Sequence, residues 1–480
     1  MGESTNQTTG SRVDRLGPGD LTMLLTDRGQ VPMNTGAILV FDGAHEPGPA
    51  ALRAVLADRV AAIPRLRQRV QRLPMGCGAP IWVDDAEFAI DRHLVDREVV
   101  DRPGDRHLLD LAAELICERM PLEHPPWRAY LVAGSPGGRV RALVLVVHHV
   151  MADGLGGLAV LRALADPGLE PLLREFPQRR PPYRSLAVDA ARQRARRVTN
   201  LGAELRLGLD GVKELSAARA HPRVAGRTSL TRPTSGRRRL STVDVPLADV
   251  VAVAKAAGGT VNDVVLAAVT GALLGVLRSR GEDPTQLVVS VPVSGRAGTD
   301  SDHLGNRTGV RPVEIPLLTD DRTRLAAIVA ITRAAKGASR ASSAGPLGLA
   351  FRLLAHLGVF AWFVDHQRLV DTFETNLRGP VEPLYLAGSE VRAVIPMAVN
   401  PGNVGVSFDV LSYAGTLGIT VVSDPDSVPD LTLLTRLLAS TLTRLCESPR
   451  PSELHTSQTS VRGRTLGGTP DSGTGRAREW

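Results

Sequence analysis

The chain of 480 residues has little cysteine and few aromatic residues. Its three cysteines, Cys77, Cys117 and Cys446, are far apart and form no CxxC pair, so neither a disulfide framework nor a thiolate metal site is predicted. Aromatic residues make up 3% of the chain and do not alternate with basic residues as single-stranded nucleic-acid sites require. We therefore expect a reducing compartment, no metal and no nucleic-acid partner.

Long apolar runs are also missing. No uninterrupted stretch approaches the roughly 20 apolar residues that cross a bilayer. The polar start, MGESTNQTTGSRVDR, has no apolar core of a secretory signal. These features predict a cytoplasmic protein, or one that is peripheral on a membrane.

Lysine is rare, and arginine supplies nearly all the positive charge. Between Arg174 and Arg239 there are seventeen Arg and Lys against five Asp and Glu, a net charge of +12 in a chain of +7, so the rest carries about −5. One interpretation is a solvated surface. The other is attraction to anionic lipid or to the phosphates of coenzyme A.

Composition and periodicity divide the chain into two α/β halves. We predict disordered tails at 1–13 and 451–480, a first domain at 14–166 and a second at 241–450. A basic, partly helical linker over 167–240 connects them, and its length favours an interdomain role.

Within the first half, strands are predicted at 31–43, 79–85, 127–134 and 139–149, the last two as a hairpin closed by SPGG, with helices at 50–63, 106–120 and after Asp153. The second half is expected to open with a strand and then a helix over 240–258. Further strands are predicted near 286–296, 372–379, 390–398 and 404–424, with helices at 259–281, 321–338, 344–366 and 429–448.

The stretch RALVLVVHHVMADG at 141–154 carries the strongest chemical signal. An apolar strand ends in His148 and His149, and Asp153 and Gly154 lead into a helical pattern. Histidine has an unperturbed pKa near neutrality and suits proton abstraction. Adjacent strand residues point to opposite faces, so only one imidazole can easily face a given tunnel. Asp153 suits an N-cap of the following helix or an ion pair with an arginine.

Taken as a motif, HHVMADG matches the HHxxxDG signature of the chloramphenicol-acetyltransferase-like acyltransferase superfamily. Further blocks in the same order resemble the bacterial wax ester synthase/diacylglycerol acyltransferases. These blocks are LGPGDLTMLLTDRGQVPMNTGAILVFDG, PLEHPPWRAYLV, TVNDVVLAAVTGAL, VPVSGR…LGNRTG, TNLRGPVEPLYLAGSEV and LSYAGTLGITVVSDPDSVPD. The likeness covers roughly residues 14–450. Asn34, in place of the family's frequent His, and Pro126 depart from it, and we interpret both as tuning the substrate channel.

The resemblance implies two chloramphenicol-acetyltransferase-like domains, each a mixed sheet flanked by helices, with a tunnel between them. It implies that His149 is the general base, that His148 and Asp153 hold it in place, and that Asn262 stabilises the oxyanion. Gly154, Trp127 and Asp263 are the expected substrate-binding residues, although Trp127 also fits a core anchor and Asp263 a structural role.

The implied reaction is transfer from acyl-CoA, a co-substrate with no cofactor beside it, to diacylglycerol or a long-chain alcohol. The substrates would be taken from the inner membrane leaflet or a lipid droplet, where the protein would be peripheral. Two alternatives stay open: a related acyltransferase acting on a specialised metabolite or a carrier-bound acyl group, and a lipid-binding relative without activity. The intact HHxxxDG favours an enzyme.

Overall fold

The computed structural model describes residues 13–27, 29–99, 106–135, 137–168, 175–199, 228–294, 308–338 and 359–447. Nearly all of the tails predicted at 1–13 and 451–480, and part of the predicted linker, lie outside these residues. Of the helix predicted at 344–366, the described part is α11 (Phe360–His366).

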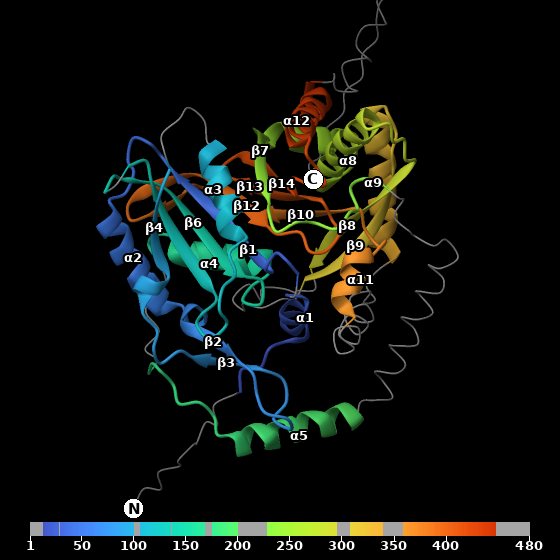
Figure 1. Ribbon diagram of the computed structural model, residues 1–480. Coiled ribbons are helices and arrows are strands. Elements are labelled where there is room, and N and C mark those ends of the chain that lie inside the picture. Colours follow the sequence, from blue (N-terminus) through green and yellow to red (C-terminus); the bar gives the residue numbers. More distant parts are fainter. Residues whose placement is uncertain are drawn as a thin grey trace, which may run out of the picture.

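Two six-stranded mixed sheets organise the described residues, as the two-domain α/β prediction requires (Figure 1). The first sheet has the order β11 (Leu384–Leu386), β12 (Ser389–Ala398), β1 (Asn34–Phe41), β6 (Val140–His148), β5 (Trp127–Ala133) and β4 (Leu94–Glu98). In this sheet β4 and β5 are parallel and the other neighbours antiparallel. The predicted hairpin is the β5–β6 pair.

The second sheet has the order β7 (Arg239–Pro246), β14 (Thr416–Ser423), β13 (Val406–Tyr413), β10 (Thr372–Arg378), β8 (Gln286–Ser294) and β9 (Thr308–Pro316). Strand β10 runs parallel to both of its neighbours. A separate small pair joins β2 (Gln68–Gln71) to β3 (Ile81–Asp84).

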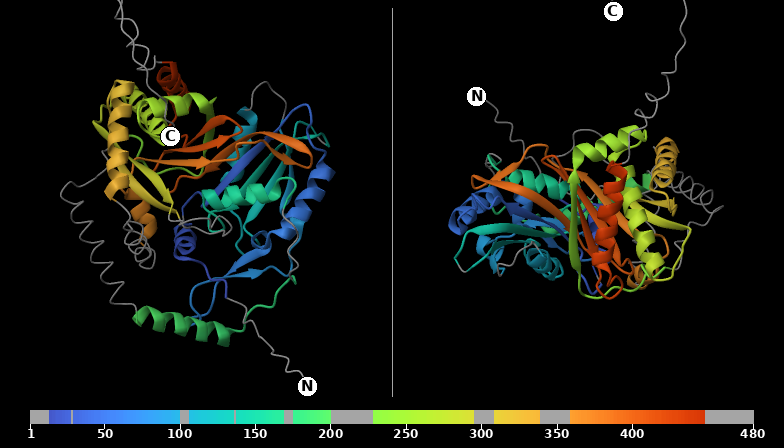
Figure 2. Two further views of the ribbon diagram at one scale, coloured as in Figure 1. Left: turned by 180° about the vertical axis from the view of Figure 1, so that it is seen from behind. Right: turned by 90° about the horizontal axis from the view of Figure 1, so that it is seen from above.

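Helices cover the sheets because their apolar stripes face the strands. Alternate residues of β6 face opposite cores: one contains α3 (Arg106–Ile116), the other α2 (Pro49–Ala62) and α4 (Gly154–Leu164). The second sheet is covered by α7 (Leu247–Ala256), α8 (Val261–Ser279), α9 (Asp321–Ala338) and α12 (Leu431–Glu447). Figure 2 shows these helices grouped on one side of the second sheet.

Among the described residues, α8 is the one helix long and apolar enough to cross a membrane, but 72% of its apolar window is buried inside the protein. Its residues form the centre of the second core. We therefore interpret α8 as a core helix.

The predicted division of the chain into two consecutive halves is wrong for strands β11 and β12. Their position in the sequence assigns them to the second domain at 241–450, but they extend the first sheet, where β12 pairs with β1. Tyr413 of β13 reinforces this crossover, since its hydroxyl donates to the Val391 carbonyl at 2.6 Å and accepts from the Leu384 N–H at 2.7 Å.

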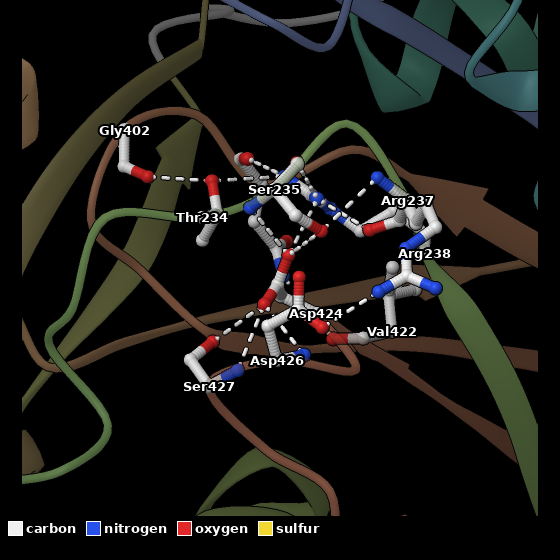
Figure 3. A network of polar contacts seen from close by, with 10 residues as sticks. Thr234, Ser235, Arg237, Arg238, Gly402, Val422, Asp424, Asp426 and Ser427 are labelled. Atoms are coloured by element: carbon white, nitrogen blue, oxygen red, sulfur yellow. Dashed lines mark hydrogen bonds and ion pairs between the residues drawn. The ribbon is translucent and has the colours of Figure 1, made fainter.

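The end of the linker is fixed by a buried ion pair (Figure 3). Arg238 and Asp424 are 3.4 Å apart, with both side chains fully buried. Asp424 also accepts hydrogen bonds from the backbone and hydroxyl groups of Ser235 and Ser427. Arg238 donates to the Asn400 carbonyl at 2.7 Å. This network ties the start of β7 to the end of β14.

Helix α5 (Tyr183–Thr199) is the described helix of the basic linker, and it lies apart from the two large sheets (Figures 1 and 2). Its buried Leu186 packs against the β2–β3 pair, and Asp189 accepts from Arg15 at 2.8 Å. Arg192, Arg194 and Arg196 of the same helix are exposed.

Candidate active site

The two histidines of the motif occupy different environments because they follow one another at the end of β6. Leu145 and Val147 line a cavity, and His149 continues their face two residues further on. His148 is 1% exposed and is not among the residues lining this cavity. The structure thus separates the pair as the alternation of a strand predicts.

His148 is held by both ring nitrogens. Its Nδ1 accepts a hydrogen bond from the Val150 N–H at 3.0 Å, and its Nε2 lies 3.3 Å from Oδ2 of Asp27. Because Nδ1 is an acceptor here, Nε2 carries the proton and donates a hydrogen bond to the carboxylate. Burial raises the pKa of Asp27, but the His148 contact and further partners outweigh it and leave that pKa lowered.

His149 is positioned through its backbone. Its N–H donates to the Met33 carbonyl at 2.7 Å, and the Met33 N–H donates to Asp27 at 3.1 Å. Asp27 therefore contacts both the neighbour of His149 and the residue that holds the His149 backbone.

Residues of both halves of the chain line the cavity beside His149. Most of its walls are aliphatic. They come from β1, β6, α4 and the short 3-10 helix Pro64–Arg67, and from β10, β12 and β13 of the later chain. They include Ala37, Leu66, Leu145, Val147, Leu158, Val160, Leu161, Leu377, Val394, Met397, Val410 and Leu411. An aliphatic cavity of this kind suits a hydrocarbon chain.

Asp153 caps α4, which confirms one of the two roles predicted for it. Its Oδ1 accepts from the Gly156 N–H at 2.9 Å. Both Asp153 and Gly154 line the cavity. A Cβ on Gly154 would lie 2.9 Å from Cδ1 of Leu377 on β10, so the glycine allows the His149 loop to approach the second sheet.

Asn262 does not line the cavity. It lies in the first turn of α8, and its side chain lowers the pKa of the fully buried Glu374 of β10. Burial first, and Asp409 next, outweigh this effect and raise the pKa of Glu374 to about 8. An oxyanion role for Asn262 stays a prediction.

Two other residues that were expected to bind substrate, Asp263 and Trp127, contact other parts of the protein. Asp263 is buried and accepts from Thr260 at 2.7 Å and from Thr332 at 2.7 Å. Trp127 is 2% exposed, donates to the Leu66 carbonyl at 2.7 Å and stacks on His93. Neither lines the cavity, and these contacts give both residues a structural role.

Asn34 is likewise outside the cavity wall, contrary to the interpretation that it tunes the channel. It is fully buried, and its side-chain amide donates to the carbonyls of Ile116 and Glu118 at 2.9 and 2.8 Å. Asn34 pairs with His148 in register and lies on the same face of the sheet, so it fixes the end of α3 beside that histidine.

Several site residues were missed by sequence reasoning. Asp27, Thr375 and Asp409 stand outside the HHxxxDG motif and have no local pattern that marks them. Thr375 and Asp409 line the cavity together with His149. Among the residues that the structure describes, no cluster of three or more His, Cys, Asp or Glu side chains is placed to hold a metal ion.

Comparison with known proteins assigns this arrangement to a family. Residues 16–265 match the wax ester synthase/diacylglycerol acyltransferase catalytic domain, and residues 304–445 match the WS/DGAT C-terminal domain. The chain belongs to the wax ester synthase/diacylglycerol acyltransferase family. It is an acyl-CoA-dependent acyltransferase.

Individual relatives support this family assignment. The diacylglycerol O-acyltransferase tgs1 of Mycobacterium tuberculosis is 31% identical over 431 residues, which cover 86% of this chain and 91% of the relative. A second relative, named as a diacylglycerol O-acyltransferase in Mycobacterium bovis, is 28% identical over 90% of this chain and 98% of its own length.

Solved structures support the fold. The wax ester synthase/diacylglycerol acyltransferase from Marinobacter aquaeolei matches with a TM-score of 0.64 at 23% identity, over 90% of this chain and 98% of that one. The first condensation domain of the calcium-dependent antibiotic synthetase matches with a TM-score of 0.60 at 20% identity, over 92% and 97%. These matches confirm the predicted chloramphenicol-acetyltransferase-like fold.

Proposed function

We propose that this acyltransferase moves a long-chain acyl group from acyl-CoA to the free hydroxyl of 1,2-diacylglycerol, giving triacylglycerol and CoA. Long-chain alcohols are a second class of acceptor and would give wax esters. The named function of the relatives supports the acceptor. The observation that carries the proposal is the place of His149 in the wall of a largely aliphatic cavity formed by both halves of the chain.

In the proposed mechanism His149 acts as general base. An alcohol is a weak nucleophile until its proton leaves, and a positioned imidazole that accepts this proton contributes about 10²–10⁴-fold in rate. The hydroxyl oxygen bonds to the thioester carbonyl carbon, and the tetrahedral intermediate then breaks its carbon–sulfur bond. The proton taken up by the imidazole goes to the departing CoA sulfur.

The residues around His149 hold it for this step. Asp153 caps α4 and closes the loop that follows the histidines. Val150 and Asp27 fix the His148 ring, and the Met33 carbonyl fixes the His149 backbone. A base that is held in this way loses little entropy when the substrate arrives.

Peripheral association with the inner membrane leaflet or with a lipid droplet is part of the proposal, because the acceptor dissolves in lipid. The exposed arginines of α5 support it. Basic side chains near an anionic surface contribute about 1 kcal/mol each.

The test uses the purified full-length chain with oleoyl-CoA and 1,2-dioleoylglycerol. CoA release and triolein are both measured. We expect turnover by the wild type, and a loss of about 10²–10⁴-fold in kcat in His149→Ala. His45→Ala, at a side chain 80% exposed, is the matched control.

Unchanged turnover in His149→Ala would overturn the base assignment. A wild-type protein that acylates other hydroxyls or uses a carrier-bound acyl donor, but makes no triolein, would overturn the acceptor. Lipid binding without any acyl transfer would contradict an enzymatic role.

A further inference from the structure

The part of the cavity wall that the later chain supplies contains one polar pair, Thr375 and Asp409. Thr375 of β10 and Asp409 of β13 are register partners on adjacent parallel strands, so both side chains lie on the same face of the sheet. Both line the cavity, while Leu377, Val394, Met397 and Leu411 around them are aliphatic. A hydroxyl and a carboxyl therefore lie side by side among aliphatic residues of the later chain.

Asp409 uses half of its hydrogen-bonding capacity within the protein. It is 6% exposed, and its Oδ2 accepts from the Ala398 N–H of β12 at 2.8 Å. Its other oxygen has no hydrogen-bond partner within the described part of the chain. Because Asp409 lines the cavity, this carboxyl would gain from a hydrogen bond to a ligand there.

The location of this pair relative to the histidine loop follows from two contacts. Gly154 lies against Leu377, and Thr375 is two residues along the same face of β10, about 7 Å away. Across the first sheet, Thr35 pairs with both Val147 and Ala398, which puts Ala398 two strand spacings, roughly 10 Å, from the strand that delivers His149. The Asp409–Thr375 pair thus lies in the part of the cavity wall that the later chain supplies, across β1 from the strand that delivers His149.

Diacylglycerol has the groups that such a polar pair could bind in the cavity that also contains His149. Its ester carbonyls lie a few bonds from its free hydroxyl, whereas a long-chain alcohol has no second oxygen. We propose that Asp409, with Thr375 beside it, is the subsite that binds an ester carbonyl of the acceptor and selects diacylglycerol over simple alcohols. This inference rests on the proposed function.

The protonation state of Asp409 agrees with this role. Burial raises its pKa to about 7, against the opposing effect of the Ala398 N–H. A substantial fraction of the side chain is then a neutral acid near neutral pH, and its O–H can donate to a carbonyl oxygen. Thr375 offers a second hydroxyl donor.

The experiment compares two acceptors that differ only in the carbonyls. With oleoyl-CoA as donor, kcat/KM is measured for 1,2-dioleoylglycerol and for its diether analogue, which keeps the hydroxyl and both chains. We expect the wild type to prefer the diester about tenfold, the range of one hydrogen bond. In Asp409→Val this ratio should fall to about one, and in Thr375→Val it should fall partly.

Asp371→Val is the matched control. Asp371, directly before β10, is also a buried carboxyl that accepts from a strand N–H, that of Val288 at 2.8 Å, but it does not line the cavity. Its diester-to-diether ratio should equal that of the wild type. If Asp409→Val does not fold, Asp409→Ser serves, since it is too short to reach the carbonyl.

A ratio of one in the wild type, or a preference that survives in both Asp409 variants, would overturn the subsite. An equal loss on both acceptors would also overturn it, because a carboxyl that acts on the acyl donor or on the fold alone gives that result. Failure of the proposed function looks different, since the wild type would then acylate neither glycerolipid.

Discussion

The carboxylate of Asp27, at the end of α1 (Pro18–Thr26), lies 3.3 Å from Nε2 of His148 and 3.1 Å from the backbone nitrogen of Met33. A single side chain therefore supports both elements that hold His149. It is a positioning residue, since it acts through His148 and Met33.

Replacing this carboxylate should loosen the base without removing it. We expect Asp27→Ala to lower kcat about tenfold or more with little change in KM, because hydrogen bonds to a charged group contribute about 1.5–3 kcal/mol. Steady-state kinetics with oleoyl-CoA measure the split. Asp96→Asn is the control, since that carboxylate pairs with Arg53 at 2.7 Å on the surface with its side chain 68% exposed. Equal losses in both variants would contradict a positioning role.

The buried pair Arg238–Asp424 should dominate the stability of the second half. Removing one partner leaves a buried charge uncompensated, so Asp424→Asn is expected to lower the free energy of unfolding by about 3–5 kcal/mol. Urea denaturation at pH 7 measures it. The adjacent surface pair Arg237–Asp426, 2.7 Å apart with side chains 70% and 56% exposed, supplies the control Asp426→Asn, which should change stability by less than about 1 kcal/mol.

Acid should act on the same network. Burial raises the pKa of Asp424, but the hydrogen bonds from Ser235 and Ser427 outweigh it and leave that pKa lowered. A lowered carboxyl pKa stabilises the fold above the unfolded-state value near 4, and this contribution is lost as the pH falls through the folded-state value. Wild type and Asp424→Asn should therefore converge in stability toward pH 3. A constant difference from pH 7 to pH 3 would argue against the ion pair as its source.

Glu374 should have the opposite pH dependence. Its folded-state pKa is raised to about 8, first by burial and then by Asp409, so the folded state holds a proton that the unfolded chain releases near pH 4–5. Stability from this group falls as the pH rises from about 5 to 8. The free energy of unfolding of Glu374→Gln, relative to that of the wild type, should therefore be higher at pH 8.5 than at pH 5.5. The exposed Glu382→Gln should show no such difference in urea denaturation.

The basic face of α5 predicts salt-dependent binding to anionic vesicles. Changing Arg192, Arg194 and Arg196 to Gln removes about 1 kcal/mol each near a charged surface, a combined loss of roughly 100-fold in affinity. Co-sedimentation at low and high salt measures it. Gln at three exposed arginines elsewhere in the chain, Arg368, Arg392 and Arg436, is the matched control. A vesicle affinity that changes neither with the α5 substitutions nor with salt would show that this face of α5 is only solvated.

Local patterns in the sequence accounted for many parts of the molecule. The strand that ends in His148, the hairpin before it and the cap at Asp153 all follow from periodicity and residue type over about twenty residues. The opposite orientations of His148 and His149 follow from the geometry of a strand alone.

Contacts between distant segments could not be inferred in this way. Asp27 and His148 are 121 positions apart, and Asp409 faces the cavity only because β13 meets β12 at the junction of the sheets. Strand β12 has the alternation of any half-buried strand, which indicates its faces but not its partner. Its place beside β1 depends on the tertiary structure.

That place has a consequence for how the protein is made. Thr35 of β1 hydrogen-bonds through its side chain to Met397 of β12, 362 positions later. At roughly 5–20 residues per second, a ribosome needs about 20–70 s to synthesise the intervening chain. During that time β1 has an open edge, which is a site for pairing with other chains. The half that carries both histidines therefore completes its sheet only near the end of translation, and severing the chain in the linker would leave that half with an unfilled edge.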